Sequence, residues 1–98
     1  MELSNQVQRF GLTVGRIVTV TEHIGPALPR ILTIDLGAQG SRECTMPRAG
    51  YESGELEGKQ VVCALRGDEL LVLAAHSHAG GVVLIRPDRG VEEGTLVG

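Results

Sequence analysis

The chain has 98 residues, a formal net charge of −3 and two aromatic residues. This length suits one domain, residues 1–98, and fourteen glycines and four prolines between short aliphatic runs are typical of a compact all-β fold. The acidic balance excludes a general electrostatic attraction to nucleic acid, so any affinity for RNA must come from a local basic cluster.

The first half of the chain predicts three strands. The spacing of apolar residues within 1–10 indicates one or two helical turns. Residues 12–23 have β-branched side chains on both faces and predict a long strand, in which Gly15 indicates a bulge or bend. After a Gly- and Pro-containing loop, 24–29, we predict two further strands, at 30–37 and 41–46.

The second half completes the pattern of a small barrel. A helical turn is predicted at 52–58, followed by strands at 59–65 and 70–75, a short strand at 80–87 and two glycine turns. Five main strands with a helix between the third and fourth are the order of an OB-fold five-stranded barrel, here with a C-terminal strand and turn extension. We therefore predict an all-β fold of this kind.

The fourth and fifth predicted strands indicate a homodimer. Both faces of 61–65 and 70–75 are apolar, whereas a solvated barrel strand alternates apolar and polar residues. We expect the outer face to be covered both by the last twenty residues and by a second copy of the chain, in a two-fold dimer. The residues expected at this interface are Val62, Leu65, Leu71 and Leu73.

Targeting and redox signals favour a reduced cytoplasmic location. The first residues lack the apolar region of a signal peptide, and no apolar run is long enough for a membrane span. Cys44 and Cys63 have no C-x-x-C spacing, so we expect two ordinary strand residues and no disulfide.

No constellation of catalytic residues is recognisable, and we predict a protein that is not an enzyme and has no cofactor. His76-Ser77-His78 would place two imidazoles on one face of a strand, but two ligands do not complete a zinc site. We interpret this segment as a polar loop and predict no metal. Arg66-Gly67-Asp68 is interpreted as a turn between two apolar runs, not as an adhesion motif.

Four segments in register carry a resemblance to a known family. They are L-T-V-G-R-I-V (12–18), I-L-T-I-D-L-G (31–37), Y-E-S-G-E-L-E-G-K-Q-V-V (51–62) and the ending L-L-V-L-A-A…V-V-L-I-R-P-D-R-G-V-E-E-G-T (70–95). In order, they resemble the tRNA-binding domain family, the EMAP-like OB module of methionyl-tRNA synthetases that is also found free-standing in CsaA-type chaperones. The resemblance implies a non-catalytic homodimeric module that binds tRNA largely through the shape and the backbone of the tRNA.

Candidate RNA contacts follow from this implied function. The best phosphate contacts are Arg30, Arg42, Arg48 and Arg66, and the ring of Tyr51 could stack on a base. The alternative is that these arginines pair with carboxylates such as Glu43, Glu52 and Glu55, and that Tyr51 packs inside the protein.

Two departures from the family lead to a second hypothesis. Residues 44–48, C-T-M-P-R, replace a small-residue motif near the RNA surface of the family, and 64–69, A-L-R-G-D-E, replace its longer basic loop. We therefore carry two functions forward: a tRNA- or RNA-binding accessory module, and a protein-binding or chaperone-like OB-fold dimer that has lost RNA binding.

Overall fold

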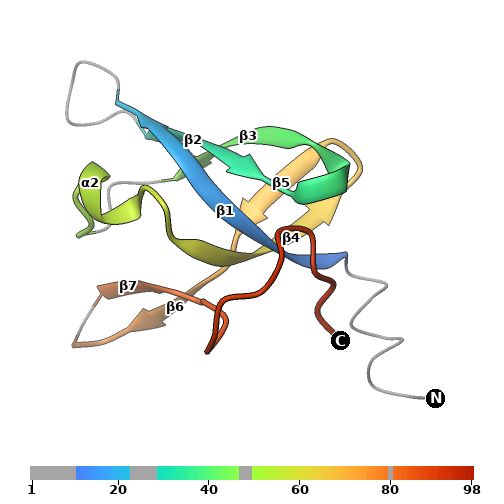
Figure 1. The fold of residues 1–98 in the computed structure, drawn as a ribbon. Helices are drawn as coiled ribbons and strands as arrows, with labels where there is room; N and C mark the ends of the chain where they lie inside the picture. The colour runs from blue at the N-terminus through green and yellow to red at the C-terminus, as the bar shows by residue number, and fades with distance from the viewer. Residues whose placement is uncertain (1–10, 23–28, 47–49, 80) are drawn as a thin grey trace.

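The computed structural model describes residues 11–22, 29–46, 50–79 and 81–98. Five antiparallel strands form one sheet, in the order β3-β2-β1-β4-β5, which curls into a nearly closed barrel (Figure 1). The strands are β1 (Leu12–Thr21), β2 (Arg30–Asp35), β3 (Ser41–Met46), β4 (Gln60–Arg66) and β5 (Glu69–Val72). The predicted helical turns within 1–10, residues 24–28 of the predicted loop and Arg48 lie outside the described residues.

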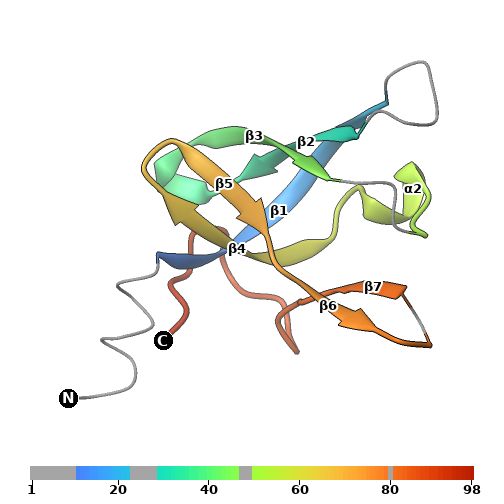
Figure 2. The ribbon, with the colours of Figure 1, turned by 180° about the vertical axis from the view of Figure 1, so that it is seen from behind.

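Three smaller elements complete the fold. A 3₁₀ turn η1 (Gly37–Gln39) joins β2 to β3, and a one-turn helix α2 (Ser53–Leu56) lies between β3 and β4. The hairpin of β6 (Ala74–Ser77) and β7 (Gly81–Leu84) forms a separate two-stranded sheet beside the barrel (Figure 2). The predicted barrel, its short helix and its C-terminal extension are thereby confirmed. None of the helices in the described ranges has the length and apolar character needed to cross a membrane.

The core is aliphatic. Its fully buried side chains come from both halves of the chain, and they are Ile17, Leu32, Ile34, Leu36, Leu56, Val61 and Cys63. Gly15 allows β1 and β2 to approach closely, because a Cβ at this position would lie 2.4 Å from Cγ2 of Ile34. Of the bulge or bend predicted at Gly15, the bulge lies elsewhere: the register between β1 and β2 shifts between Ile17 and Thr19.

The predicted strand at 70–75 is two strands, because the chain changes sheets at Leu73. The backbone N–H of Leu73 donates to the carbonyl of Val62 (2.9 Å), and from there the chain leaves β4 to begin β6. Ile85, after β7, takes over the vacated edge of β4: the N–H of Val62 donates to its carbonyl (2.9 Å). The polar loop predicted at residues 76–78 was also wrong, because His76 and Ser77 belong to β6.

The C-terminal residues add to the edge of β1. The N–H of Val14 donates to the carbonyl of Thr95 (2.9 Å), and the N–H of Gly94 donates to the carbonyl of Val14 (2.7 Å). One step further, the N–H of Val97 donates to the carbonyl of Leu12 (3.0 Å). Residues 91–97, which we call the tail, thus pair with the part of β1 that β2 does not reach, since β2 pairs with β1 only from Arg16 onward.

Candidate functional site

An apolar groove of about 360 Å³ opens where the barrel meets the hairpin. Its walls come from the end of β3, from β5 and its continuation into β6, and from β7. The lining residues are Thr45, Met46, Leu71, Val72, Leu73, Ala74, His76, Val82 and Leu84. Most of the lining is aliphatic, so the groove suits apolar side chains.

Two unpaired strand edges lie along this groove. β3 and β5 are neighbours, and the guanidinium of Arg42 at the start of β3 donates from Nη1 to the carbonyl of Gly67, just before β5 (3.2 Å). The two strands run in the same direction, yet within the described residues no ladder joins them: β3 pairs with β2 and β5 with β4. The facing edges therefore carry backbone N–H and C=O groups that no strand of the described residues pairs with.

Exposed aliphatic side chains lie in the groove and beyond it. Leu71, which lines the groove, is 60% exposed, and Val83 and Ile85, which do not line it, are also exposed. Of the other residues predicted at the dimer interface, Val62 is buried, and Leu65 and Leu73 are half-buried. Leu71 is thus the predicted interface residue that presents most of its side chain to solvent.

The predicted RNA contacts are dispersed. Arg30 is buried, with 5% exposure, and its Nε donates to Oε1 of Glu22 (3.1 Å). Arg42 Nη1 lies 3.8 Å from Oδ1 of Asp68 in addition to its bond with the Gly67 carbonyl. Arg66 is exposed at the end of β4 and pairs in register with Glu69. The described members of the set therefore do not form a face of free guanidinium groups.

Tyr51 has a clear structural role. Its ring packs against the buried core, and its hydroxyl accepts a hydrogen bond from the backbone N–H of Leu84 (3.1 Å). The side chain thereby ties the segment before α2 to the last residue of β7.

A second, polar cleft of about 200 Å³ lies on the side of the barrel that the tail covers. We call it the arginine cleft; its lining residues are Arg16, Gly58, Gln60, Arg86, Pro87, Asp88, Arg89 and Gly90. None of its three arginines was among the residues predicted from the sequence to bind a ligand. The available signal was Arg16, which interrupts the apolar positions of β1.

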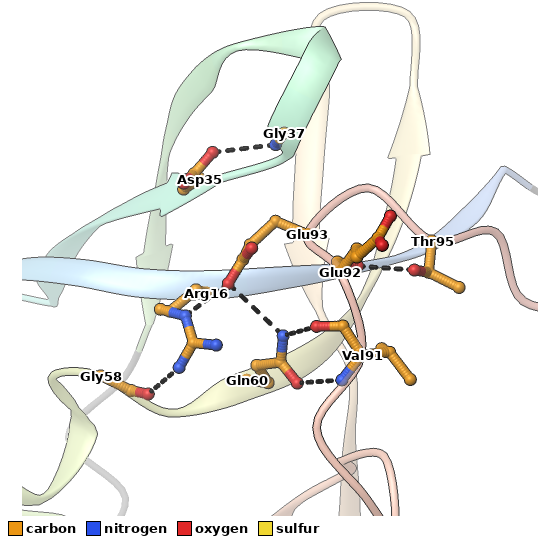
Figure 3. Close-up of polar contacts among 9 residues, drawn as sticks. All are labelled: Arg16, Asp35, Gly37, Gly58, Gln60, Val91, Glu92, Glu93 and Thr95. Atoms are coloured by element: carbon orange, nitrogen blue, oxygen red, sulfur yellow. Dashed lines mark hydrogen bonds and ion pairs between the residues drawn. The ribbon is translucent and has the colours of Figure 1, made fainter.

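The amide side chain of Gln60 fixes one wall of the arginine cleft (Figure 3). Its Nε2 donates to the carbonyl of Val91, and its Oε1 accepts from the N–H of Val91 (3.0 Å). Beside it, Arg16 donates from Nε to the carboxylate of Glu93 and from Nη1 to the carbonyl of Gly58 (2.8 Å). The hydrogen bond from Arg16 lowers the pKa of Glu93 below its ordinary value of 4.5.

The two cysteines are free thiols in the core. Burial raises the pKa of Cys44 to about 11 and that of Cys63 to about 12, where the neighbouring Cys44 adds to the shift. Both are therefore protonated, unreactive groups at neutral pH. In the described part of the chain no group of three or more His, Cys, Asp or Glu residues is placed to hold a metal ion.

Comparison with known proteins identifies structural relatives. No protein-family model and no curated protein matches the sequence. The CsaA chaperone protein from Picrophilus torridus is 25% identical over 100% of both chains, with a TM-score of 0.83. The chaperone CsaA from Bacillus anthracis is 24% identical over 100% of this chain and 99% of that one, with a TM-score of 0.80.

A third solved structure extends the comparison beyond chaperones. The MetRS-related protein from Pyrococcus horikoshii is 23% identical over 99% of both chains, with a TM-score of 0.76. These matches confirm the fold over its whole length, and they fall on the CsaA-type and MetRS-related proteins that the sequence resemblance indicated.

Proposed function

We propose that the protein is a non-catalytic binding module of the chaperone-like type, which holds an apolar segment of another polypeptide in the apolar groove. The observation that carries this proposal is the position of the groove along two unpaired strand edges. The full-length similarity to CsaA chaperone proteins supports it.

The expected ligand is an extended segment with apolar residues at alternate positions. Such a segment would add to the free edge of β3 or β5 through its backbone, and every second side chain would enter the groove. The volume of about 360 Å³ is at the small end of ligand pockets. Few side chains can therefore be held at once, which favours weak and sequence-tolerant binding.

A pair of adjacent valines provides a sharp test. Val82 lines the groove, whereas Val83, its neighbour on the opposite face of β7, is exposed and does not line it. Val82→Asp should weaken the binding of a fluorescent Leu- and Val-rich peptide at least about tenfold in an anisotropy titration, because a buried carboxylate faces the ligand. Val83→Asp should bind it nearly as well as the unmodified chain. Equal losses in both variants would contradict the assignment.

The same proposal includes a homodimer. Exposed Leu71 and Ile85 offer an apolar surface that a second copy could cover. Leu71→Asp should convert the dimer to a monomer in sedimentation velocity. A dimer that persists in this variant would place the interface elsewhere. The two free thiols are compatible with the reducing, cytoplasmic location expected from the sequence.

RNA binding is the second candidate function. The exposed guanidinium of Arg66 and the nearby Arg42, at the hairpin between β4 and β5, favour it, as does the similarity to the MetRS-related protein. Two phosphate contacts would give a log–log salt dependence with a slope of roughly −2. An anisotropy titration with total tRNA at two salt concentrations tests it. If no binding is seen at low salt, RNA binding is excluded, and polypeptide binding is the proposed function that remains.

A further inference from the structure

We propose that the arginine cleft is a binding site for a phosphate group. The cleft shares no lining residue with the apolar groove and contains none of the residues predicted to contact RNA. Its three guanidinium groups come from β1 and from the segment that follows β7, which the fold brings together.

Two of these guanidinium groups are fixed by hydrogen bonds to the protein and still have N–H groups free to bind a ligand. Arg16 is fixed by Glu93 and by the carbonyl of Gly58. Arg86 donates from Nε to the carbonyl of Gln60 (3.1 Å). Within the described residues, the Nη2 group of Arg16 and both terminal nitrogens of Arg86 make no hydrogen bond. Because the side chains are already ordered, a ligand that accepts from them meets a smaller loss of rotamer entropy.

The floor of the cleft is rigid and open to close approach. Gln60 is buried and clamps the backbone of Val91, so the wall that it forms is fixed by hydrogen bonds from both ends of its amide (Figure 3). Gly58 and Gly90 have no side chains to fill the space. A compact anion can therefore reach the guanidinium groups inside a volume of about 200 Å³.

The charged groups around the cleft favour the binding of an anion, and two carboxylates act against it. Glu93, which is outside the lining, neutralises Arg16, and Asp88 is the acid within the lining. The side chain of Asp88 is 98% exposed, and its Oδ2 lies 3.8 Å from Nε of Arg89. It is therefore solvated and competes only weakly with a bound anion for the guanidinium groups. Three positive and two negative charges leave the cleft with a net charge of +1. A phosphate fits better than a carboxylate, because its tetrahedral oxygens accept from several guanidinium groups at once.

The test is a titration of the ¹⁵N-labelled protein with inorganic phosphate, at constant ionic strength set by chloride. We expect saturable shifts of the Gly90 and Val91 amides and of the Arg16 and Arg86 Nε signals, with a Kd on the order of 1 mM. Shifts that stay linear with concentration, or that chloride reproduces, would overturn the proposal.

Four single substitutions test which residues contribute to phosphate binding. Arg86→Ala should weaken phosphate binding at least about fivefold, and Arg89→Ala, whose side chain is exposed and supports no other element, about twofold to fivefold. Asp88→Asn should strengthen it by about twofold, since it removes a like charge. Arg66→Ala, on the hairpin of β4 and β5, should have no effect. Unchanged affinity in both Arg89→Ala and Asp88→Asn would overturn the assignment even if Arg86→Ala failed to fold.

A final arm distinguishes the sources of the phosphate group. Methyl phosphate is a monoester dianion, and dimethyl phosphate is a diester monoanion like the backbone of a nucleic acid. Tighter binding of methyl phosphate would support a terminal phosphate or the free ion as ligand. Equal binding of the two would support a phosphodiester. Saturable binding of neither would overturn the proposal.

Discussion

Among the described residues, strand edges of the barrel lack a neighbouring barrel strand at two places, and the two places differ in what covers the edge. At the first, β1 and β4 lose their strand partners part of the way along, and residues from the end of the chain take over. Ile85 pairs with β4 and the tail pairs with β1. At the second, β3 and β5 lie side by side with no ladder between them in the described residues, and an apolar groove follows the gap.

We therefore expect the first edge to serve the stability of the fold and the second to serve binding. The covered edge is completed by backbone hydrogen bonds and by the polar contacts of Gln60 and Arg16, so its hydrogen-bonding capacity is used within the chain. The open edge keeps unpaired backbone groups beside aliphatic side chains, which is the combination an incoming strand requires. Changes to the covered edge should therefore alter stability, and changes to the open edge should alter binding.

The largest effect is expected from Gly94→Ala. Gly94 has φ +88° and packs against the turn after β2, where an added Cβ would lie 2.5 Å from the carbonyl oxygen of Leu36. Backbone strain and this clash should lower the free energy of unfolding by about 2–4 kcal/mol in urea denaturation, limited by the free energy with which the tail docks. Peptide binding at the apolar groove should persist.

Gly58→Ala is the matched control. Gly58 has a similar φ of +86° and, like Gly94, stands at the third position of a turn closed by a backbone hydrogen bond, but an added Cβ would meet nothing within 4 Å. It should lose only the strain of the positive φ, about 1–2 kcal/mol. Equal losses in the two variants would show that the packing of the tail against Leu36 contributes nothing to stability.

A smaller loss is expected from Gln60→Met. Methionine keeps most of the buried volume but leaves the N–H and C=O of Val91 without the partners that Gln60 supplies. The cost should be about 1–3 kcal/mol, and amide exchange of the tail should accelerate more than exchange in the barrel.

Gln39→Met provides the comparison for this change. Gln39 is exposed in η1, and the same substitution there should stay within about 0.5 kcal/mol of the unmodified chain. If both variants were equally stable, Gln60 would not be a clamp on the tail.

The sequence carried enough local information for the barrel. β-Branched runs bounded by Gly and Pro marked β1 to β4 closely, because each strand is specified by its own side chains. The division at Leu73 was missed because it depends on Ile85 competing for the edge of β4, a contact between residues distant in sequence. The tail pairing with β1 is non-local in the same way.

The site residues were harder to predict, although one signal was present. Arg30 shares its face of β2 with Leu32 and Ile34, so strand alternation places it toward the core and away from RNA. The prediction of an RNA contact at Arg30 considered the charge of its side chain and not this alternation. The arginine cleft was missed for a different reason: Arg16 and Arg86 are 70 positions apart in the sequence (86 − 16), and the pairing of both β1 and Ile85 with β4 brings them to one cleft.

The smallest effect concerns acid and the ion pair between Glu93 and Arg16. Because the pKa of Glu93 is lowered in the folded chain, the ion pair contributes stability above the ordinary carboxyl value of 4.5, and that contribution is lost as the pH falls below it. Protection of the Gly94 and Val97 amides, measured by hydrogen exchange and corrected for intrinsic rates, should fall by roughly two- to fivefold between about pH 5.5 and 3.5. The Glu93→Gln variant should show low protection already at pH 5.5 and little further change. A variant that kept the full pH dependence would assign it to other carboxylates, and the covered edge would then rest on the backbone pairing and Gln60 alone.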